Sequence, residues 1–341
     1  MPLRSVLAAS LVAVACCVAA PARAADPVPA TVSADLDNPS GVAVHAATGH
    51  VFVATHPGVF RLVPGKPGKL TAEVGGFKTD IYGKGPKYEI GPLGVALLGN
   101  DHLIVGDGSL VDSEELVRVY KIGPKPAEQP ASPESAAFLL GPIKAGADSA
   151  KGEGNFYAVA VGPKAFYVTS NGDDTKGWIL KSDIVDGKPG ELKPFIATKP
   201  AVNVDAPVAI TITKDGASLV VGQMGEMNVP GDSLLCMYDA ATGKLQKSLK
   251  TGLHDIAGLA YSPKTGKLYG VDYAWADTKQ GGLYEFTVSG DECKTTKIAS
   301  LDKPTALAFD KEGGLYVTVF GTKADNATTP AGALLHFKSG L

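Results

Sequence analysis

The sequence predicts an all-β fold, a six-bladed β-propeller built from four-stranded antiparallel blades. The first observation is a repeated unit of two short apolar strands around a tight turn, seen first in PSGVAVHAATGHVFVAT at residues 39–55. The second is its spacing, because the unit recurs at intervals of roughly 50 residues, a period typical of propellers. The third is the content of 41 glycines and 24 prolines, which suits many tight turns. The first strands of the six units are centred on Ala43, Ala96, Ala160, Thr211, Ala260 and Ala308.

The two inner strands of each unit are near-continuous apolar runs, as expected for sheets packed on both faces between neighbouring blades. The two outer strands carry more Lys, Glu and Thr, as expected near the rim. We expect these outer strands at Val59–Val63 and Leu70–Val74, Leu116–Ile122 and Ala137–Leu140, Trp178–Ser182 and Leu192–Ala197, Leu234–Tyr238 and Leu245–Leu249, and Leu283–Val288 and Thr295–Ser300. The Pro-rich stretch 124–135 is predicted to be an irregular connection, and almost no helix is expected.

The ends of the chain are predicted to meet in one blade. The sixth unit has a third strand at Ala333–Phe337 but no fourth strand before the sequence ends. Thr31–Leu36 precedes the first unit much as Lys297–Leu301 precedes the sixth. We therefore expect Thr31–Leu36 to complete the last blade, which closes the ring and removes open sheet edges.

Residues 1–24 are predicted to form a secretory signal peptide. A basic residue and the apolar run Val6–Ala15 precede an A-x-A cleavage site that ends at Ala24. The apolar run is too short to span a membrane. We expect the mature chain, residues 25–341, to be a single propeller domain that is exported to the periplasm or the cell exterior. Lipoprotein processing at Cys16 is the alternative, because Ala-Val-Ala-Cys is a loose lipobox.

The charge balance weighs against nucleic-acid binding. The chain has 32 Lys and Arg against 35 Asp and Glu, and only Arg61 and Arg118 remain as arginines after the signal segment. The sequence has no basic amphipathic stretch of the kind that binds a membrane surface. No integral membrane segment is expected in the mature chain. We expect a monomer. Cys236 and Cys293 lie in adjacent units, so a disulfide is one interpretation; a buried Cys236 with an exposed thiol at Cys293 is the other.

The longer loops are predicted to gather on one face of the propeller, where binding residues usually lie. Candidate ligand-binding residues in these loops are Asp107, Asn171, Asp173, Tyr273 and Trp275. The two aromatic side chains could stack on a sugar or an aromatic ligand. The alternative is structural, since Asp and Asn are ordinary turn formers and the aromatic rings could pack beneath their loop.

Three polar residues are predicted to surround the mouth of the central channel. Asn155, Asp205 and Asp255 each fall one or two residues before an innermost strand, so their oxygen atoms could hold Ca²⁺ or another divalent cation. If such a metal activates a water, Asp255 or Glu153 is a candidate base, and His254 is a further catalytic candidate. A structural histidine is the other interpretation of His254.

The starts of the units resemble those of NHL and SMP-30/gluconolactonase-like propellers. The motifs are Pro39–Val44 (PSGVAV), Pro304–Phe309 (PTALAF) and Gly314–Val317 (GLYV). The resemblance implies a six-bladed fold, and for the SMP-30 type it implies lactonase activity with a divalent metal held by acidic and Asn side chains at the channel mouth. In this chain the corresponding positions are Asn155 and Asp205, with Asp255 in the next unit.

Two functions from different classes follow from these observations. The first is a non-catalytic scaffold that binds a small molecule, a glycan or a protein through its loop-rich face. The alternative is a divalent-metal-dependent hydrolase of lactone type. A third interpretation, a sugar dehydrogenase with a quinone cofactor, lacks the Arg and His residues that such a site needs. The sequence leaves open whether the protein is an enzyme.

Overall fold

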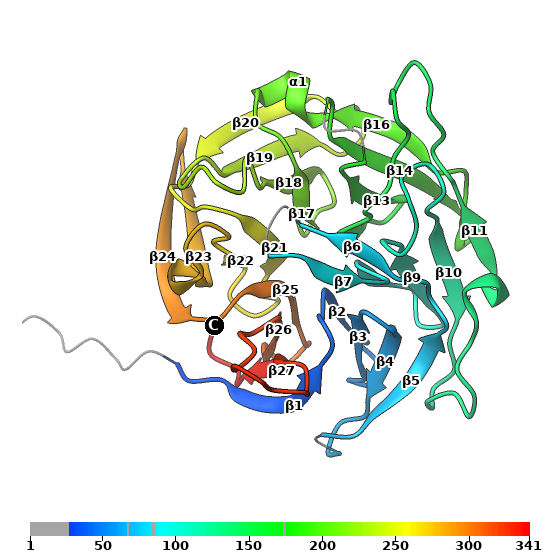
Figure 1. Ribbon diagram of the computed structural model, residues 1–341. Coiled ribbons are helices and arrows are strands. Elements are labelled where there is room, and N and C mark those ends of the chain that lie inside the picture. The colour runs from blue at the N-terminus through cyan, green and yellow to red at the C-terminus, as the bar shows by residue number, and fades with distance from the viewer. Residues whose placement is uncertain (1–26, 67, 84–85, 173–174) are drawn as a thin grey trace, which may run out of the picture.

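The structure, a computed structural model, describes residues 27–341 except 67, 84–85 and 173–174. In this part of the chain, six sheets are arranged like blades around a central channel (Figure 1). The predicted all-β propeller is therefore confirmed. The predicted signal segment 1–24, with the alternative lipid site at Cys16, lies outside the described residues.

Each blade is built on a four-stranded antiparallel sheet, and in the first five blades sequence order runs from the channel outward. The first blade contains β2 (Gly41–Val44), β3 (Val51–Thr55), β4 (Gly58–Leu62) and β5 (Leu70–Gly75). The second contains β8 (Val95–Leu98), β9 (His102–Gly106), β10 (Val117–Lys121) and β11 (Phe138–Leu140). The third contains β12 (Val159–Val161), β13 (Ala165–Ser170), β14 (Trp178–Val185) and β16 (Lys193–Ala197), with a short extra strand β15 (Lys188–Pro189). The next two contain β17 (Pro207–Ile212), β18 (Ser218–Gln223), β19 (Leu234–Asp239) and β20 (Leu245–Lys250); and β21 (Ile256–Tyr261), β22 (Leu268–Asp272), β23 (Gly282–Ser289) and β24 (Glu292–Ser300).

The last blade combines both ends of the described chain. Its order is β25 (Pro304–Phe309), β26 (Leu315–Val319), β27 (Gly332–Phe337) and β1 (Ala30–Leu36). Strand β1 pairs antiparallel with β27, with Thr31 opposite Leu335 and Leu36 opposite Gly332. Figure 1 shows the blue strand β1 beside the red strand β27. The predicted closure of the ring is confirmed.

The predicted outer strands agree with the structure to within a few residues. The largest differences are three residues: β14 ends at Val185 rather than at Ser182, and β24 begins at Glu292 rather than at Thr295. Ser289 pairs with Glu292, so only two residues form the turn, and one of them is Gly290 with φ 59°. A two-residue turn of this kind lets β24 pair with β23 from its first residue. The sequence did not predict these first residues as strand because they are mostly polar and carry no apolar alternation.

The hydrophobic core lies between blades rather than in one central mass. Strand β3 is buried along its whole length, and Phe52 in it packs in one cluster with Leu103, Val105 and Tyr120 of the second blade. Strand β20 at the rim instead alternates between exposed and less exposed side chains. This gradient is the reason that inner strands are continuously apolar and outer strands are mixed.

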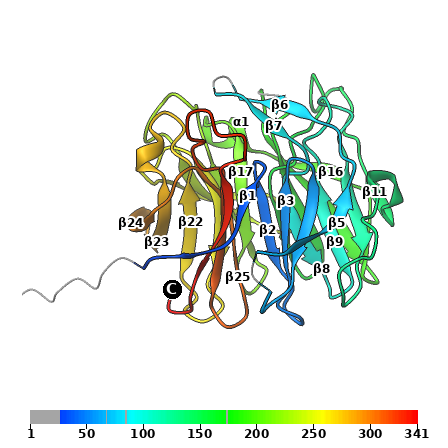
Figure 2. The same cartoon turned by 60° about the horizontal axis from the view of Figure 1, so that its bottom comes forward.

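A hairpin that the sequence did not predict lies across one end of the channel. Strands β6 (Asp80–Tyr82) and β7 (Tyr88–Ile90) pair with each other. In the sequence they lie between the last strand of the first blade and the first strand of the second. Figure 1 shows the hairpin over the channel, and Figure 2 shows it on the same end of the propeller as the short helix α1 (Thr198–Val202). The remaining helical segments are single 3₁₀ turns at Pro133–Ser135 and Thr278–Gln280.

The Pro-rich connection covers the outer edge of the first blade. The amide of Ala131 donates to the Glu73 carbonyl of β5, and the amide of Gly75 donates to the Ala131 carbonyl, both at 2.9 Å. A buried ion pair joins the same regions: Arg61 Nη2 lies 2.6 Å from Glu73 Oε1, and Arg61 Nη1 donates to the Gly123 carbonyl. The connection therefore satisfies an edge strand that would otherwise be open.

Both cysteines in the described residues are free thiols. Cys236 is buried in β19 and Cys293 is partly exposed in β24. The disulfide interpretation is therefore not supported. No helix in the described part of the chain is long and apolar enough to cross a membrane.

Candidate functional site

A polar pocket of about 350 Å³ lies at the channel mouth, on the face that carries the hairpin. Its polar side chains come from loops of the second, third and fourth blades, which the ring brings together. The charged and amide side chains among them are Asp112, Lys151, Asn155, Asn171, Lys199, Asp205 and Glu226. Three of the residues that the sequence singled out, Asn155, Asn171 and Asp205, therefore meet in one pocket.

The two asparagines present buried acceptors that the described residues leave unused. The side-chain oxygens of Asn155 and Asn171 are buried and have no hydrogen-bond partner in the described part of the chain. Asn155 also has a left-handed backbone, with φ 49°, and its amide donates to the Glu115 carboxyl group. Burial raises the pKa of that carboxyl group to about 9. Unused buried acceptors are costly unless a water or a ligand donates to them.

Asp205 already has a cationic partner. Its Oδ2 lies 2.6 Å from Lys199 Nζ of helix α1, and its Oδ1 accepts from the amide of Ala206 at 2.7 Å. Ala206 has φ 57°, a conformation that alanine rarely adopts. The turn therefore holds the carboxylate against the pocket wall with its charge balanced by a lysine.

The three predicted metal ligands do not form one ligand set. Asp255 is buried and does not line the polar pocket; its Oδ2 accepts from the amide of Trp275. Asp205 already pairs with Lys199. Within the described residues, no group of three or more His, Cys, Asp or Glu side chains could hold a metal ion. The donor set therefore does not fit a divalent cation held by all three, and we derive no step through a metal.

The other catalytic candidates face inward. Glu153 is fully buried and accepts from Ser170 Oγ at 2.7 Å and from the amide of Gly172 at 3.2 Å. His254 donates its backbone amide to Asp272 Oδ2, and neither it nor Glu153 lines the pocket. The Glu153 carboxylate holds loop backbone in place, and the Nδ1 of His254 is buried without a partner in the described residues, so neither side chain presents a reactive group to the pocket.

Asp107 also has a structural environment. It is fully buried, pairs with Arg118, and accepts from Ser109 through both the amide and the hydroxyl group. Its oxygen atoms are thus engaged inside the second blade rather than at the pocket surface. Asp173, the remaining polar candidate, lies outside the described residues.

The aromatic candidates join a cluster that holds the hairpin over the channel. The rings of Tyr273 and Trp275 stack with centroids 5.0 Å apart. Trp275 contacts Tyr82 and Tyr88 of the hairpin edge to face, and the Tyr273 hydroxyl lies 2.9 Å from that of Tyr88. Tyr88 also packs on Phe320 of the sixth blade, at 4.9 Å. Aromatic contacts with the fifth and sixth blades therefore anchor the hairpin, which follows the first blade in the sequence.

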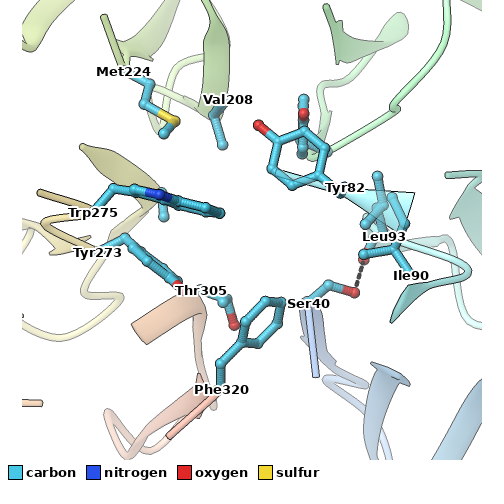
Figure 3. A pocket seen from close by; sticks show the side chains of 12 residues that line it. Ser40, Tyr82, Ile90, Leu93, Val208, Met224, Tyr273, Trp275, Thr305 and Phe320 are labelled. Atoms are coloured by element: carbon cyan, nitrogen blue, oxygen red, sulfur yellow. Dashed lines mark hydrogen bonds between the residues drawn. The ribbon is translucent and has the colours of Figure 1, made fainter. Parts of the chain in front are cut away.

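A second, apolar cavity of about 80 Å³ lies beneath this cluster (Figure 3). Figure 3 shows the rings of Tyr82, Trp275 and Phe320 around a common space, with Met224 at its edge. The cavity and the polar pocket share Tyr82, Tyr157 and Met224 in their walls. Tyr273 and Trp275, predicted to bind a ligand, line this cavity and also pack against the hairpin.

Sequence reasoning missed the hairpin and the two lysines of the polar pocket. A signal for the hairpin was present, because Gly83 and Pro86 lie between two short runs that each contain Tyr and Ile. Lys151 and Lys199 gave no such signal, since lysines are common at the surface of this chain. Only the ring brings them beside Asn155.

Asp255 is expected to make stability depend on pH. Burial, with Asp272 and Asp232 nearby, raises the pKa of Asp255 from 3.8 to about 7. The folded state then keeps a proton that the unfolded state releases, so this stabilisation is complete below pH 3.8 and is lost as pH rises through about 7. Between about pH 5 and pH 7, the free energy of unfolding of wild type should fall with pH more steeply than that of D255N, by up to about 1.4 kcal/mol per pH unit. Urea unfolding at a series of pH values measures both slopes. Equal pH slopes for the two proteins would contradict this assignment.

Comparison with known proteins shows similarity in structure only. No protein-family model matches the chain, and no curated protein matches it in sequence. A Thermus thermophilus protein described as an oxidoreductase of glucose dehydrogenase type aligns over 92% of this chain and 100% of its own, with TM-score 0.58 and 15% identity. A gluconolactonase from Xanthomonas campestris aligns over 90% and 88%, with TM-score 0.57 and 13% identity.

Hydrazine synthase from Kuenenia stuttgartiensis is a further structural match, over 85% of this chain and 76% of that one, with TM-score 0.54 and 17% identity. At such identities the matches show a shared fold and nothing about activity. The fold agrees with the propeller type that the motifs at the starts of the blades resemble.

Proposed function

We propose that this propeller binds a small polar organic molecule in the pocket at the channel mouth. The observation that carries the proposal is the pair of buried amide oxygens of Asn155 and Asn171, which line one pocket and have no partner in the described residues. A concave site with a few convergent polar groups is the usual form of a small-molecule site. This favours a small ligand over a protein partner for the loop-rich face.

The chemistry of the lining suggests the class of ligand. The amide oxygens of Asn155 and Asn171 accept hydrogen bonds, so they favour a ligand with hydroxyl groups. Lys151 and Lys199 donate, so they favour a carbonyl or carboxylate oxygen on the same ligand. A sugar-derived acid or its lactone combines both groups. Export of the protein, which the first 24 residues predict, would place such binding outside the cytoplasm.

Calorimetric titration with gluconate and with glucono-δ-lactone tests the proposal. Replacing Asn155 by Ala should weaken binding by roughly 5–10-fold, the effect of losing one good hydrogen bond. D205N should instead strengthen gluconate binding, because it removes a negative charge and lets Lys199 pair with the ligand carboxylate. D215N is the matched control, because Asp215 lies in an exposed turn of the same blade between β17 and β18. Equal affinities for wild type and N155A would exclude this pocket as the binding site.

Hydrolysis of a lactone is a second candidate. Asn155 and Asp205 favour it, because they share the pocket and are positions at which the resemblance to SMP-30-like propellers implies metal ligands. The fold shared with the Xanthomonas gluconolactonase also favours it. The test is release of acid from glucono-δ-lactone, measured with added Ca²⁺ and with chelator. Turnover above the spontaneous rate, with or without Ca²⁺, that falls in N155A supports hydrolysis. Binding without turnover in either condition leaves a ligand-binding protein.

A further inference from the structure

We propose that the apolar cavity beneath the hairpin is a second binding site, which takes a short alkyl group or small ring. Joined to the polar pocket, it would select an amphipathic ligand: a hydroxylated acid, amide or lactone with a small apolar end. This inference rests on the proposed function for the polar half of the ligand. The apolar half rests on the cavity alone.

Five hydroxyl groups in the cavity wall have partners within the protein, and two of them, those of Tyr82 and Tyr157, are hydrogen-bonded to each other. Ser40 Oγ donates to the Pro92 carbonyl at 2.9 Å, and Thr305 Oγ1 donates to the Pro39 carbonyl at 2.6 Å. The Tyr273 hydroxyl is paired with that of Tyr88. The remaining wall is formed by aromatic and aliphatic side chains. A water there would find few partners, so the cavity favours an apolar occupant.

The size of the cavity limits that occupant. An engineered apolar cavity of about 150 Å³ is large enough to bind benzene. The cavity here is about 80 Å³. It therefore suits a group of about three or four carbon atoms and excludes a long fatty chain.

The two pockets are arranged so that one ligand can reach both. Tyr82, Tyr157 and Met224 line both of them, so the two spaces adjoin at these three side chains. Figure 3 shows Met224 and Tyr82 in the wall of the cavity, on either side of Val208. The methionine side chain is flexible and can adapt to a ligand that passes it.

Backbone strain lies at the same place. Ala274, between Tyr273 and Trp275, is fully buried and has φ 53°. An alanine in this conformation is strained, and such strain is often found where side chains must be held in a defined arrangement. Here it accompanies the stacking of the two rings at the cavity wall.

A series of N-alkyl gluconamides tests the proposal, because the polar head stays constant while the tail grows from methyl to octyl. By calorimetry, affinity should rise about fourfold for each added CH₂ up to propyl or butyl and then stop rising. A257V, which fills the cavity, should remove this gain while leaving gluconate binding unchanged. A260V is the matched control on the same strand, since Ala260 lines the channel below rather than the cavity. If A257V does not fold, V208I replaces it.

The outcomes separate this inference from the proposed function. Gluconate binding with no gain along the series would overturn the inference and leave the proposed function intact. If neither gluconate nor any gluconamide binds, the proposed function is wrong. Chemical-shift changes on adding xenon, measured by NMR, then show whether the cavity binds an apolar atom. Xenon binding to wild type and A260V but not to A257V would support an apolar site. Equal xenon response in all three proteins would reject it.

Discussion

Removing residues 27–36, which include β1, is expected to destabilise the propeller more than any single substitution. Leu36 is buried and Val32 is half-buried against the first and last blades, so the loss of their burial alone should cost about 3–5 kcal/mol. The deletion also leaves the backbone of β27 unpaired along its outer edge, which favours aggregation. Urea unfolding and size-exclusion chromatography measure the two effects.

The controls for this deletion use the same strand. L36A should cost about 2–4 kcal/mol, whereas T31A should change stability little because Thr31 is exposed. A synthetic peptide of residues 27–36, added to the deleted chain, should restore stability by pairing with β27. A deleted chain as stable as the full one would contradict the closure of the ring as a source of stability.

Replacing Arg61 by Met is expected to destabilise the protein by about 3–5 kcal/mol, because it leaves the Glu73 carboxylate buried without its cationic partner. Arg61 is 1% exposed, donates to Gly123 and lies 4.5 Å from the Phe52 ring centre. Burial already raises the pKa of Glu73, and Arg61 opposes that shift. In R61M the carboxyl group should therefore take up a proton at a higher pH, which urea unfolding as a function of pH can detect.

The double variant R61M/E73L distinguishes the ion pair from packing. Replacing both partners by apolar side chains removes the buried charge, so stability should return to within about 2 kcal/mol of wild type. K181M is the surface control, since Lys181 pairs with the exposed Asp183 and such pairs contribute about 1 kcal/mol or less. If the double variant were no more stable than R61M, lost packing of the arginine rather than the unpaired charge would be the cause.

Much of the fold could be predicted because its signal is local. A strand, a tight turn and a second strand are encoded within about 17 residues, and each blade repeats that pattern. Even the closing strand was predictable, because Thr31–Leu36 has the same relation to its blade as the strand before the sixth unit. The hairpin β6–β7 escaped notice because its strands are only three residues long and pair with no blade.

The site was predicted only in part, because convergence is not local. Asn155, Asn171 and Asp205 were candidates and do meet in one pocket. Asp255 and Glu153 have the same chemistry and similar positions in their loops, yet both turn inward to bind backbone amides. The direction of such a side chain depends on one or two dihedral angles in a loop, and no periodic pattern records them.

The sequence by itself determined the architecture of this protein: the number of blades, the order of their strands and the strand that closes the ring. These follow from alternation and repetition along the chain, which burial between blades requires. Tertiary structure alone decided that the hairpin covers the channel, that Lys199 rather than Asp255 faces Asp205, and that an apolar cavity adjoins the polar pocket. Those features depend on contacts between blades far apart in sequence, which form only once the ring has closed.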